Sequence, residues 1–381
     1  MTLCPIAITQ ELVRIQSVTP DSSVCLDVVE KYMKSIGAKI VRKTFSQEGT
    51  YDVDNIYARI GTGSPHIMLT GHVDVVPIGE TSLWTQDPWG GDIVDGKLYG
   101  RGSADMKSGV ASSIVAMTNV YNDPSFTGSV SILITGDEEA KAINGTEKVL
   151  KYVSDMGESW DCALTLEATN FGTMADQIKV GRRGSLTARV IAHGKQGHVG
   201  YPERVDNALH SMCRLMNAIV DIPMDNGNQF FDPSSVQIVH VNGGTGATNI
   251  APGTADFTFN IRFSSQFTGD SLTALINETL DATGRKYTLE IDRINRSFVT
   301  DPADNPLADQ LADVIDSVVG SRPAYVTNGG TSDSRFITNY CPVVDYGVNG
   351  STIHQVDECV SVSDIEQLEK IVTMYLKTKV C

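Results

Sequence analysis

The chain has 381 residues, of which 41% are hydrophobic and 20% are charged, and its formal net charge is −16. That length is sufficient for two domains with substantial cores, and the composition is typical of a soluble globular protein. The excess of negative charge argues against nucleic acid and anionic membrane surfaces as partners. No run of eighteen apolar residues predicts a membrane span, and residues 1–20 lack the pattern of a signal peptide.

The seven cysteines are scattered, odd in number and never spaced C-x-x-C. This pattern argues against a disulfide framework or a thiolate zinc cluster. It favours a reducing, cytoplasmic setting in which the thiols stay free.

The first half of the chain alternates predicted strands and helices. Apolar spacing predicts helices at 6–15 and 23–36, strands at 38–45, 55–60 and 66–70, a helix that begins near Asp105, a strand at 129–134, a helix at 145–156 and a strand at 161–166. This alternation indicates a layered α/β domain with a largely parallel central sheet.

The pattern changes after residues 181–184, GRRG. The next predicted elements are a strand at 185–193, a helix at 206–220, strands at 235–241 and 255–263, a helix at 271–282 and a strand at 287–294. The order β-α-β-β-α-β is typical of a ferredoxin-like domain. The α/β pattern then resumes, with helices at 307–319 and 363–377 and strands at 324–327 and 343–346. We therefore expect a ferredoxin-like domain at 183–296, inserted into a catalytic domain made of 1–182 and 297–381. A capping box of Ser363 and Glu366 predicts the start of the last helix.

Five candidate metal ligands each follow a predicted strand or lie at a strand-to-helix turn. They are His72, Asp105, Glu139, Glu167 and His354. Ligands bind at the carboxyl ends of strands in open α/β sheets, and zinc takes about four nitrogen or oxygen donors. Two imidazoles and three carboxylates could serve two zinc ions roughly 3.5–4 Å apart if one carboxylate bridges them. Such a pair would relieve the repulsion between Glu138 and Glu139.

Each of these residues also has an ordinary structural interpretation. Either histidine could be hydrogen-bonded to backbone in a turn, Asp105 could be a helix N-cap, and Glu167 could lie at the surface. Spacing by itself leaves a metal site and a solvated acidic turn equally open.

Four motifs resemble, in this order, those of the dinuclear zinc aminoacylase and carboxypeptidase family: HVDVVP at 72–77, GRGSADMKSG at 100–109, GDEEA at 136–140 and STIH at 351–354. The matching segments span essentially the whole chain. Further stretches resemble the branch of this family that acts on succinylated diamino-diacids: NGTEKVL at 144–150, VGRRGSL at 180–186, QGHVGYPERVDNALH at 196–210, GGTGATN at 243–249 and NGGTSDSRF at 328–336.

The resemblance implies a role for each matching residue. His72, Asp105 and Glu167 would hold one zinc ion, and Asp105, Glu139 and His354 the other, with cobalt able to replace zinc. Asp74 would orient the His72 imidazole, and Glu138 would act as general base on a water between the metals. The family also places a histidine of the partner subunit's inserted domain near the oxyanion. Here that residue would be His198, so the resemblance implies a homodimer and a dimerisation role for the inserted domain.

A succinylated diamino-diacid carries several carboxylates, which calls for local positive charge. Arg182 and Arg262 are the candidates because a guanidinium pairs bidentately with a carboxylate, while Thr331 could add a hydroxyl and Asn249 an amide. Ordinary interdomain ion pairing is the alternative for the arginines.

Three positions depart from the family pattern. Ala168 follows Glu167 where proline is usual, and Gly350 and Thr248 stand where asparagine is usual. The last two positions face the substrate in the family, so these departures leave the acyl preference open.

We therefore expect a cytoplasmic dinuclear zinc amidohydrolase that removes a succinyl group from a diamino-diacid. A deacetylase or general aminoacylase of the same family is the nearest alternative, and a catalytically silent metal-binding homologue is a remote one.

Overall fold

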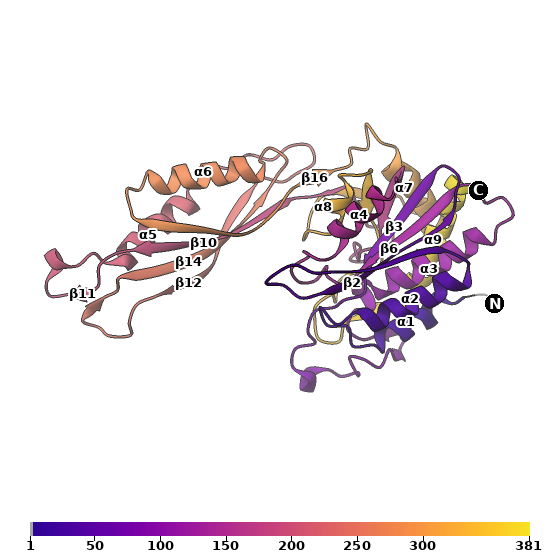
Figure 1. The fold of residues 1–381 in the computed structure, drawn as a ribbon, viewed down its shortest axis with the longest axis horizontal. Helices are drawn as coiled ribbons and strands as arrows, with labels where there is room; N and C mark the ends of the chain where they lie inside the picture. The colour runs from indigo at the N-terminus through magenta and orange to yellow at the C-terminus, as the bar shows by residue number, and fades with distance from the viewer. Residues whose placement is uncertain (1–2) are drawn as a thin grey trace. The chain divides into compact units, whose positions relative to one another are not determined.

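A computed structural model describes residues 3–381, which form two compact units. The first unit contains the chain up to Val180, together with Thr300–Val326 and Ser332–Cys381. The second contains Gly181–Val299 and Thr327–Thr331 (Figure 1). The predicted insertion at 183–296 lies inside the second unit. That unit also includes Thr327–Thr331, which overlap the start of the NGGTSDSRF stretch at 328–336.

An eight-stranded sheet forms the centre of the first unit, in the order β1-β2-β6-β3-β7-β18-β8-β17. The strands are β1 Lys39–Phe45, β2 Val53–Gly61, β3 His66–His72, β6 Ser129–Thr135, β7 Cys162–Thr165, β8 Gln177–Lys179, β17 Ala324–Val326 and β18 Val343–Asp345. The four central strands β6, β3, β7 and β18 run parallel, whereas β1 and β2 pair antiparallel at one edge. The predicted largely parallel central sheet is confirmed. Every residue of β6 is buried, which explains its mostly apolar sequence without alternation.

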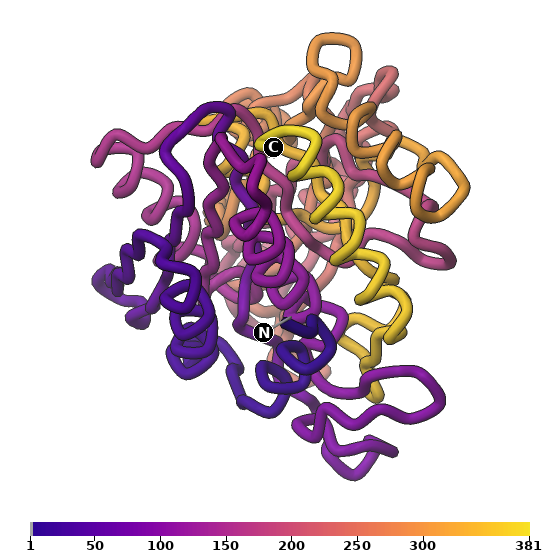
Figure 2. Tube along the Cα trace, turned by 90° about the vertical axis from the view of Figure 1, so that its right-hand side faces the viewer, coloured from indigo at the N-terminus to yellow at the C-terminus, as the bar shows by residue number. Residues whose placement is uncertain are grey.

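Helices cover both faces of this sheet. They are α1 Pro5–Val13, α2 Ser23–Ser35, α3 Ser108–Tyr121, α4 Thr146–Asp155, α7 Leu307–Val319, α8 Ser334–Ile337 and α9 Val362–Val380. Helices α1, α2 and α3 lie on one face, and α4 and α8 on the other (Figure 1). Figure 2 shows α9, in yellow, running beside α3, against which it packs. Within the described part of the chain, no helix combines the length and apolar character needed to cross a membrane.

Two predicted helix starts are wrong. Helix α3 begins at Ser108 rather than near Asp105, whose backbone angles of φ −117° and ψ 94° are not helical. The reason is that a carboxylate from a distant segment accepts the N–H groups of this turn, as described below. Helix α9 begins at Val362 because β19, Cys359–Ser361, runs directly into it. Ser361 is therefore the N-cap, and the predicted capping box at Ser363 is absent.

The second unit is an antiparallel sheet of order β12-β14-β10-β15 with two helices packed on it. Its elements are β10 Gly184–His193, α5 Ala208–Val220, β12 Ser235–Gly243, β14 Thr254–Phe263, α6 Gly269–Asp281 and β15 Tyr287–Asn295. Leu186, Val190, Phe257, Phe259 and Leu272 are among the buried residues of its core. This is the predicted ferredoxin-like order. Strand β12 is one edge of the sheet, and most of its residues are exposed.

Candidate metal centre and active site

The carboxyl ends of three neighbouring strands bring the first group of candidate residues together. His72 is the last residue of β3 and pairs in register with Thr135, the last residue of β6. The glutamate pair at 138–139 follows β6, and Glu167 follows β7, the other neighbour of β3. Parallel strands end at one edge of a sheet, so the three segments meet there.

Asp105 lies at the centre of the cluster and faces a histidine with each carboxylate oxygen. Its Oδ1 is 3.2 Å from Nε2 of His72, and its Oδ2 is 3.4 Å from Nε2 of His354. Glu167 adds an oxygen 3.5 Å from Nε2 of His72, and Glu139 adds one 3.1 Å from Nε2 of His354. The cluster thus consists of two three-residue groups that share Asp105, and within each group the donor atoms lie within 4.8 Å of one another.

The two histidines differ in exposure and in backbone conformation. The side chain of His72 is 1% exposed, whereas that of His354 is 49% exposed. His354 also has a positive φ of 60°, a left-handed conformation that is uncommon for residues other than glycine and often occurs at functional sites. One half of the cluster is therefore enclosed by the fold, and the other is open to solvent at an irregular turn.

The three carboxylates of this cluster favour a positive charge among them. Hydrogen bonds to Asp105 and Glu139 raise the pKa of His354 to about 10, despite partial burial. Burial opposes protonation of His72, but contacts with Asp105, Asp74 and Glu167 raise its pKa well above the usual value. The surrounding carboxylates thus favour positive charge at both imidazoles. Since imidazole nitrogens and carboxylate oxygens are also the donors that zinc prefers, the residues fit two divalent metal ions that share Asp105.

Glu138 belongs to neither ligand group, although it is adjacent to Glu139. Burial raises the pKa of Glu138 well above its usual value; the charge of His72 opposes this, and the charges of Asp333, Glu167 and Glu139 add to it. A carboxyl group next to the cluster, with elevated proton affinity and no place among the ligands, has the properties required of a general base.

Asp74 connects His72 to the glutamate pair. Nδ1 of His72 lies 2.9 Å from the main-chain oxygen of Asp74 and 3.5 Å from its carboxylate, so the backbone makes the shorter contact. The carboxylate also accepts the side-chain hydroxyl of Thr19 at 2.7 Å. Asp74 itself is fully buried. It therefore holds the ring nitrogen that points away from the cluster.

Asp137 was not singled out from the sequence, although it belongs to the GDEEA motif. It is fully buried, and its carboxylate accepts the Tyr51 hydroxyl at 2.7 Å and the backbone N–H groups of Ala142, Ile143 and Asn144 at 2.9–3.1 Å. Asp137 thus fixes the loop that follows the glutamate pair. The available sequence signal was an aspartate at a strand end followed by a short segment before a helix.

The candidate substrate residues and His198 all lie in the second unit. Arg182 is buried on β9, Gly181–Arg182, and donates to the main-chain oxygen of Gly330, beside Thr331, at 2.9 Å. Arg262 is half-buried on β14, and burial together with the charge of Arg183 lowers its pKa. His198 and Asn249 are exposed. His198 lies on β11, Gly197–His198, which pairs with β13, Ile250–Ala251, and the adjoining Val199 N–H donates to the main-chain oxygen of Asn249 at 3.1 Å. None of them belongs to the metal-ligand groups.

Two of the three departures from the family pattern contact each other. A Cβ built on Gly350 would lie 3.2 Å from Cβ and 3.2 Å from the main-chain oxygen of Ala168. Residue 168 therefore leaves little room for a side chain at 350. Asn349 turns away and donates to the oxygen of Gly172 at 3.3 Å. Thr248, the third departure, is exposed in the second unit.

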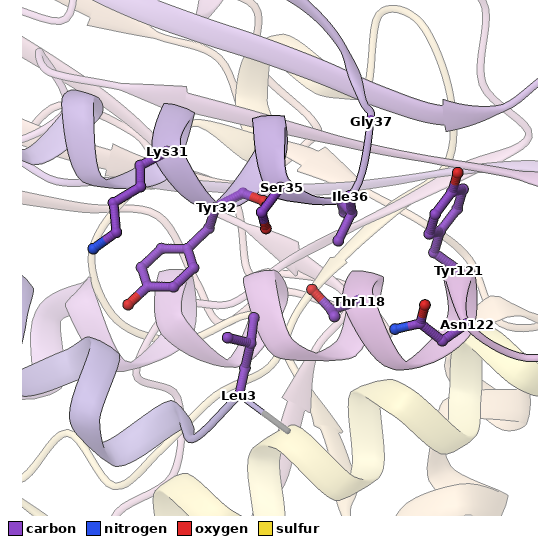
Figure 3. Close-up of a pocket in the computed structure, with 9 residues that line it drawn as sticks. All are labelled: Leu3, Lys31, Tyr32, Ser35, Ile36, Gly37, Thr118, Tyr121 and Asn122. Atoms are coloured by element: carbon purple, nitrogen blue, oxygen red, sulfur yellow. The ribbon is translucent and has the colours of Figure 1, made fainter. Parts of the chain in front are cut away.

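A pocket elsewhere in the first unit does not include the cluster. It lies between α2 and α3 and is lined by residues that include Lys31, Tyr32, Thr118 and Tyr121 (Figure 3). No residue of the two metal-ligand groups lines it, and we assign it no part in the chemistry.

Fold and site together place two imidazoles and three carboxylates at the carboxyl edge of an α/β sheet, a donor set that suits a metal-dependent hydrolase. The sequence model of peptidase family M20/M25/M40 matches residues 68–378. The chain belongs to this family, whose members are metal-dependent hydrolases.

Individual relatives agree with this assignment. The chain is 44% identical over 372 residues to a succinyl-diaminopimelate desuccinylase of Bradyrhizobium sp. (strain BTAi1 / ATCC BAA-1182), covering 96% of each protein. Among solved structures, it resembles an M20-family metallo-carboxypeptidase from Sulfolobus solfataricus, with a TM-score of 0.82, 16% identity and 98% of each chain covered. It also resembles a dinuclear metal-binding peptidase of the M20 family from Bacillus subtilis, with a TM-score of 0.67, 15% identity and 98% of each chain covered. These two structures share the fold of this chain.

Proposed function

We propose that the chain is a succinyl-diaminopimelate desuccinylase. It would hydrolyse N-succinyl-L,L-2,6-diaminopimelate to succinate and L,L-2,6-diaminopimelate, a reaction of lysine and diaminopimelate biosynthesis. The main observation in favour of hydrolysis is that the two ligand groups share Asp105, whereas Glu138, next to Glu139, belongs to neither group. Near-full-length similarity to relatives of that name supports the choice of substrate.

In this proposal, His72, Asp105 and Glu167 hold one zinc ion, and Asp105, Glu139 and His354 hold the other; cobalt can take the place of zinc. The metal pair, when bound, supplies Lewis-acid polarisation of the amide carbonyl and a more acidic water. Asp74 keeps the His72 ring oriented through Nδ1, so that Nε2 remains directed at the cluster.

Glu138 carries the proton through the reaction. Its carboxylate takes a proton from the attacking water as the new C–O bond forms at the amide carbon. As the C–N bond breaks, Glu138 returns that proton to the leaving amine nitrogen. Succinate and the free diamino-diacid result, and the base is regenerated.

The second unit would recognise the substrate. Arg182 and Arg262 would pair with its carboxylates, and Thr331 and Asn249 would add neutral hydrogen bonds. Burial, together with the charge of Arg183, lowers the pKa of Arg262, so this guanidinium would gain from a carboxylate partner. Guanidinium groups suit a ligand with several carboxylates.

A homodimer is part of the same proposal, with His198 of one subunit stabilising the oxyanion formed in the other. Its support is the exposure of His198 in the single chain and the open edge of β12, where Val239 and Val241 are 61% and 48% exposed. An exposed apolar edge strand is a ready site for pairing with a second chain. We also place the enzyme in the cytoplasm, which agrees with seven unpaired cysteines.

Competing substrates test the proposal. Purified zinc-loaded protein is assayed with N-succinyl-L,L-2,6-diaminopimelate and with N-acetyl-L-ornithine, and the Glu138→Gln variant controls for contaminating hydrolases. We expect a much larger kcat/KM for the succinyl compound. Faster turnover of the acetyl compound would instead identify a deacetylase of the same family.

A further inference from the structure

Glu358 and Arg101 form a buried ion pair close to Asp105. Oε2 of Glu358 lies 2.6 Å from Nη1 of Arg101, and the two side chains are 0% and 3% exposed. Arg101 is further held by the face of Trp84, 5.3 Å from its guanidinium carbon to the ring centre. Isolated buried charges are very costly, so each partner fixes the other in place.

The second oxygen of Glu358 accepts hydrogen bonds from the turn that carries Asp105. Oε1 lies 3.1 Å from the backbone N of Ala104 and 3.2 Å from the backbone N of Asp105. Because Asp105 is not helical, these buried N–H groups need an acceptor from outside their own turn. Glu358 supplies that acceptor.

The same segment is joined to the His354 turn. Thr352 and Cys359 close the turn through two hydrogen bonds, Thr352 Oγ1 to Cys359 O at 2.9 Å and Cys359 N to Thr352 Oγ1 at 3.1 Å. Strand β19 then pairs with β5, Lys97–Tyr99, and the main-chain oxygen of Glu358 accepts the N–H of Gly100 at 2.9 Å. Glu358 thus belongs to the segment that provides His354, and its side chain reaches the turn that provides Asp105.

We propose that Glu358 is a positioning residue for the metal centre: by accepting the N–H groups of Ala104 and Asp105, it fixes the Asp105 carboxylate between His72 and His354. This inference rests on the proposed metal centre. Because Asp105 belongs to both ligand groups, a shift of its backbone would weaken both metal sites together.

Two double variants isolate the acceptor oxygen from the ion pair. Arg101→Met with Glu358→Leu removes both charges and the acceptor, whereas Arg101→Met with Glu358→Gln removes both charges but keeps an oxygen for the two N–H groups. Removing both partners leaves no unpaired buried charge, which protects folding better than either single change. Arg59→Met with Glu158→Gln is the matched control, since Arg59 and Glu158 also form a partly buried pair, at 2.7 Å, that contacts no metal-ligand residue.

The readout is binding of Co²⁺ to the chelator-treated full-length protein, followed by visible absorption and by competition with Zn²⁺. We expect the Glu358→Leu double variant to bind Co²⁺ roughly 10–100-fold more weakly, as for other residues that orient metal ligands. The Glu358→Gln double variant and the Arg59/Glu158 control should retain affinity and spectrum close to wild type. Thermal unfolding of the metal-free proteins should show a lower midpoint for the Glu358→Leu double variant, because two buried N–H groups lose their acceptor, but both variants should be fully folded at the temperature of the titration.

Three results would overturn the inference: wild-type Co²⁺ affinity in the Glu358→Leu double variant, equal weakening in both Glu358 variants, or equal weakening in the control. In those cases packing or overall stability, and not the acceptor oxygen of residue 358, determines the affinity for Co²⁺. A wild-type protein that binds neither Co²⁺ nor Zn²⁺ would refute the proposed metal centre itself, and the inference with it.

Discussion

The carboxylate of Asp74 accepts a hydrogen bond from the backbone N–H of Glu138, with Oδ1 and N 3.2 Å apart. Its other oxygen accepts the N–H of Glu139 at 3.1 Å. One buried carboxylate therefore fixes the backbone of both the proposed base and a proposed ligand, and it also lies 3.5 Å from Nδ1 of His72. Asp74 acts on three parts of the site, although the sequence suggested only the contact with the imidazole.

Replacement of Asp74 by asparagine should disturb this arrangement while changing little volume. The amide has one accepting oxygen, and its NH₂ group would face one of the two N–H donors. We expect metal affinity and kcat to fall roughly 10–100-fold. Isothermal titration with Zn²⁺ and steady-state kinetics measure the two losses. Asp54→Asn, which alters a partly buried ion pair with Arg42 that includes no metal-ligand residue, is the control. Unchanged metal binding in Asp74→Asn would contradict the positioning role.

Glu138→Gln should separate catalysis from metal binding. Glutamine cannot take the proton of the attacking water, so turnover should fall by roughly 10²–10⁴-fold, the usual contribution of a general base. Metal content, measured by mass spectrometry of the dialysed protein, should stay at the wild-type value. Glu139→Gln is the matched comparison, because it removes a ligand oxygen and should lower metal content as well. If both variants lost metal equally, the proposed division of labour between the glutamates would be wrong.

Removal of metal should abolish hydrolysis and lower stability. Without metal, Glu139, Glu167 and Asp105 crowd around two histidines, and a ligand that binds only the folded state stabilises it by mass action. Zinc at about 100 times its Kd should add ~2.7 kcal/mol to the free energy of unfolding. Chelator titration followed by activity and by calorimetry measures both effects. Hydrolysis that persists in excess chelator would contradict a metal mechanism.

His66 should make the fold sensitive to mild acid, independently of the metal centre. Burial, aided by the charge of Arg59 and opposed by that of Glu158, lowers the pKa of His66 to about 4. The unfolded chain binds a proton near pH 6.5, whereas the folded chain does not until about pH 4. Stability is therefore full above pH 6.5 and declines as the pH falls toward 4, by about 2 kcal/mol at pH 5.

Urea unfolding of metal-free protein at pH 7.5 and pH 5.0 checks this dependence. His66→Asn should unfold at lower urea than wild type at pH 7.5, because the hydrogen bond of Nε2 with Ser131 Oγ, at 3.0 Å, is changed. Between pH 7.5 and pH 5.0, His66→Asn should lose about 2 kcal/mol less free energy of unfolding than wild type. His210→Gln, a change at an exposed histidine, should retain the wild-type pH dependence. An equal pH dependence in all three proteins would refute the effect.

Much of the fold follows from local sequence patterns. Short-range preferences are visible in the apolar stretch of β6 and in the alternation of β15. Another is the glycine that ends α7, Gly320, whose φ is 83°. The five candidate ligands could be listed because each follows a predicted strand or lies at a strand-to-helix turn. Their convergence depends on strand order, which periodicity does not encode.

The parts that could not be predicted depend on contacts between distant residues. Asp105 resembles a helix N-cap in sequence, but Glu358, far along the chain, takes over the N–H groups of its turn. Asp137 resembles a third acid beside two glutamates, yet it serves the backbone of the loop after them. The tight approach of Gly350 to Ala168 likewise shows that two separate departures from the family pattern concern one contact.

The scatter of the ligands along the chain has a consequence for biosynthesis. A ribosome that has just completed Glu167 has made all of the group His72, Asp105 and Glu167, but the other group still lacks His354. At 5–20 residues per second, the intervening chain takes on the order of ten seconds or more to make. During that time the nascent protein has only half of its proposed centre. On this proposal, a nascent chain that has not reached His354 would lack one ligand of the second group and would not yet hydrolyse the amide.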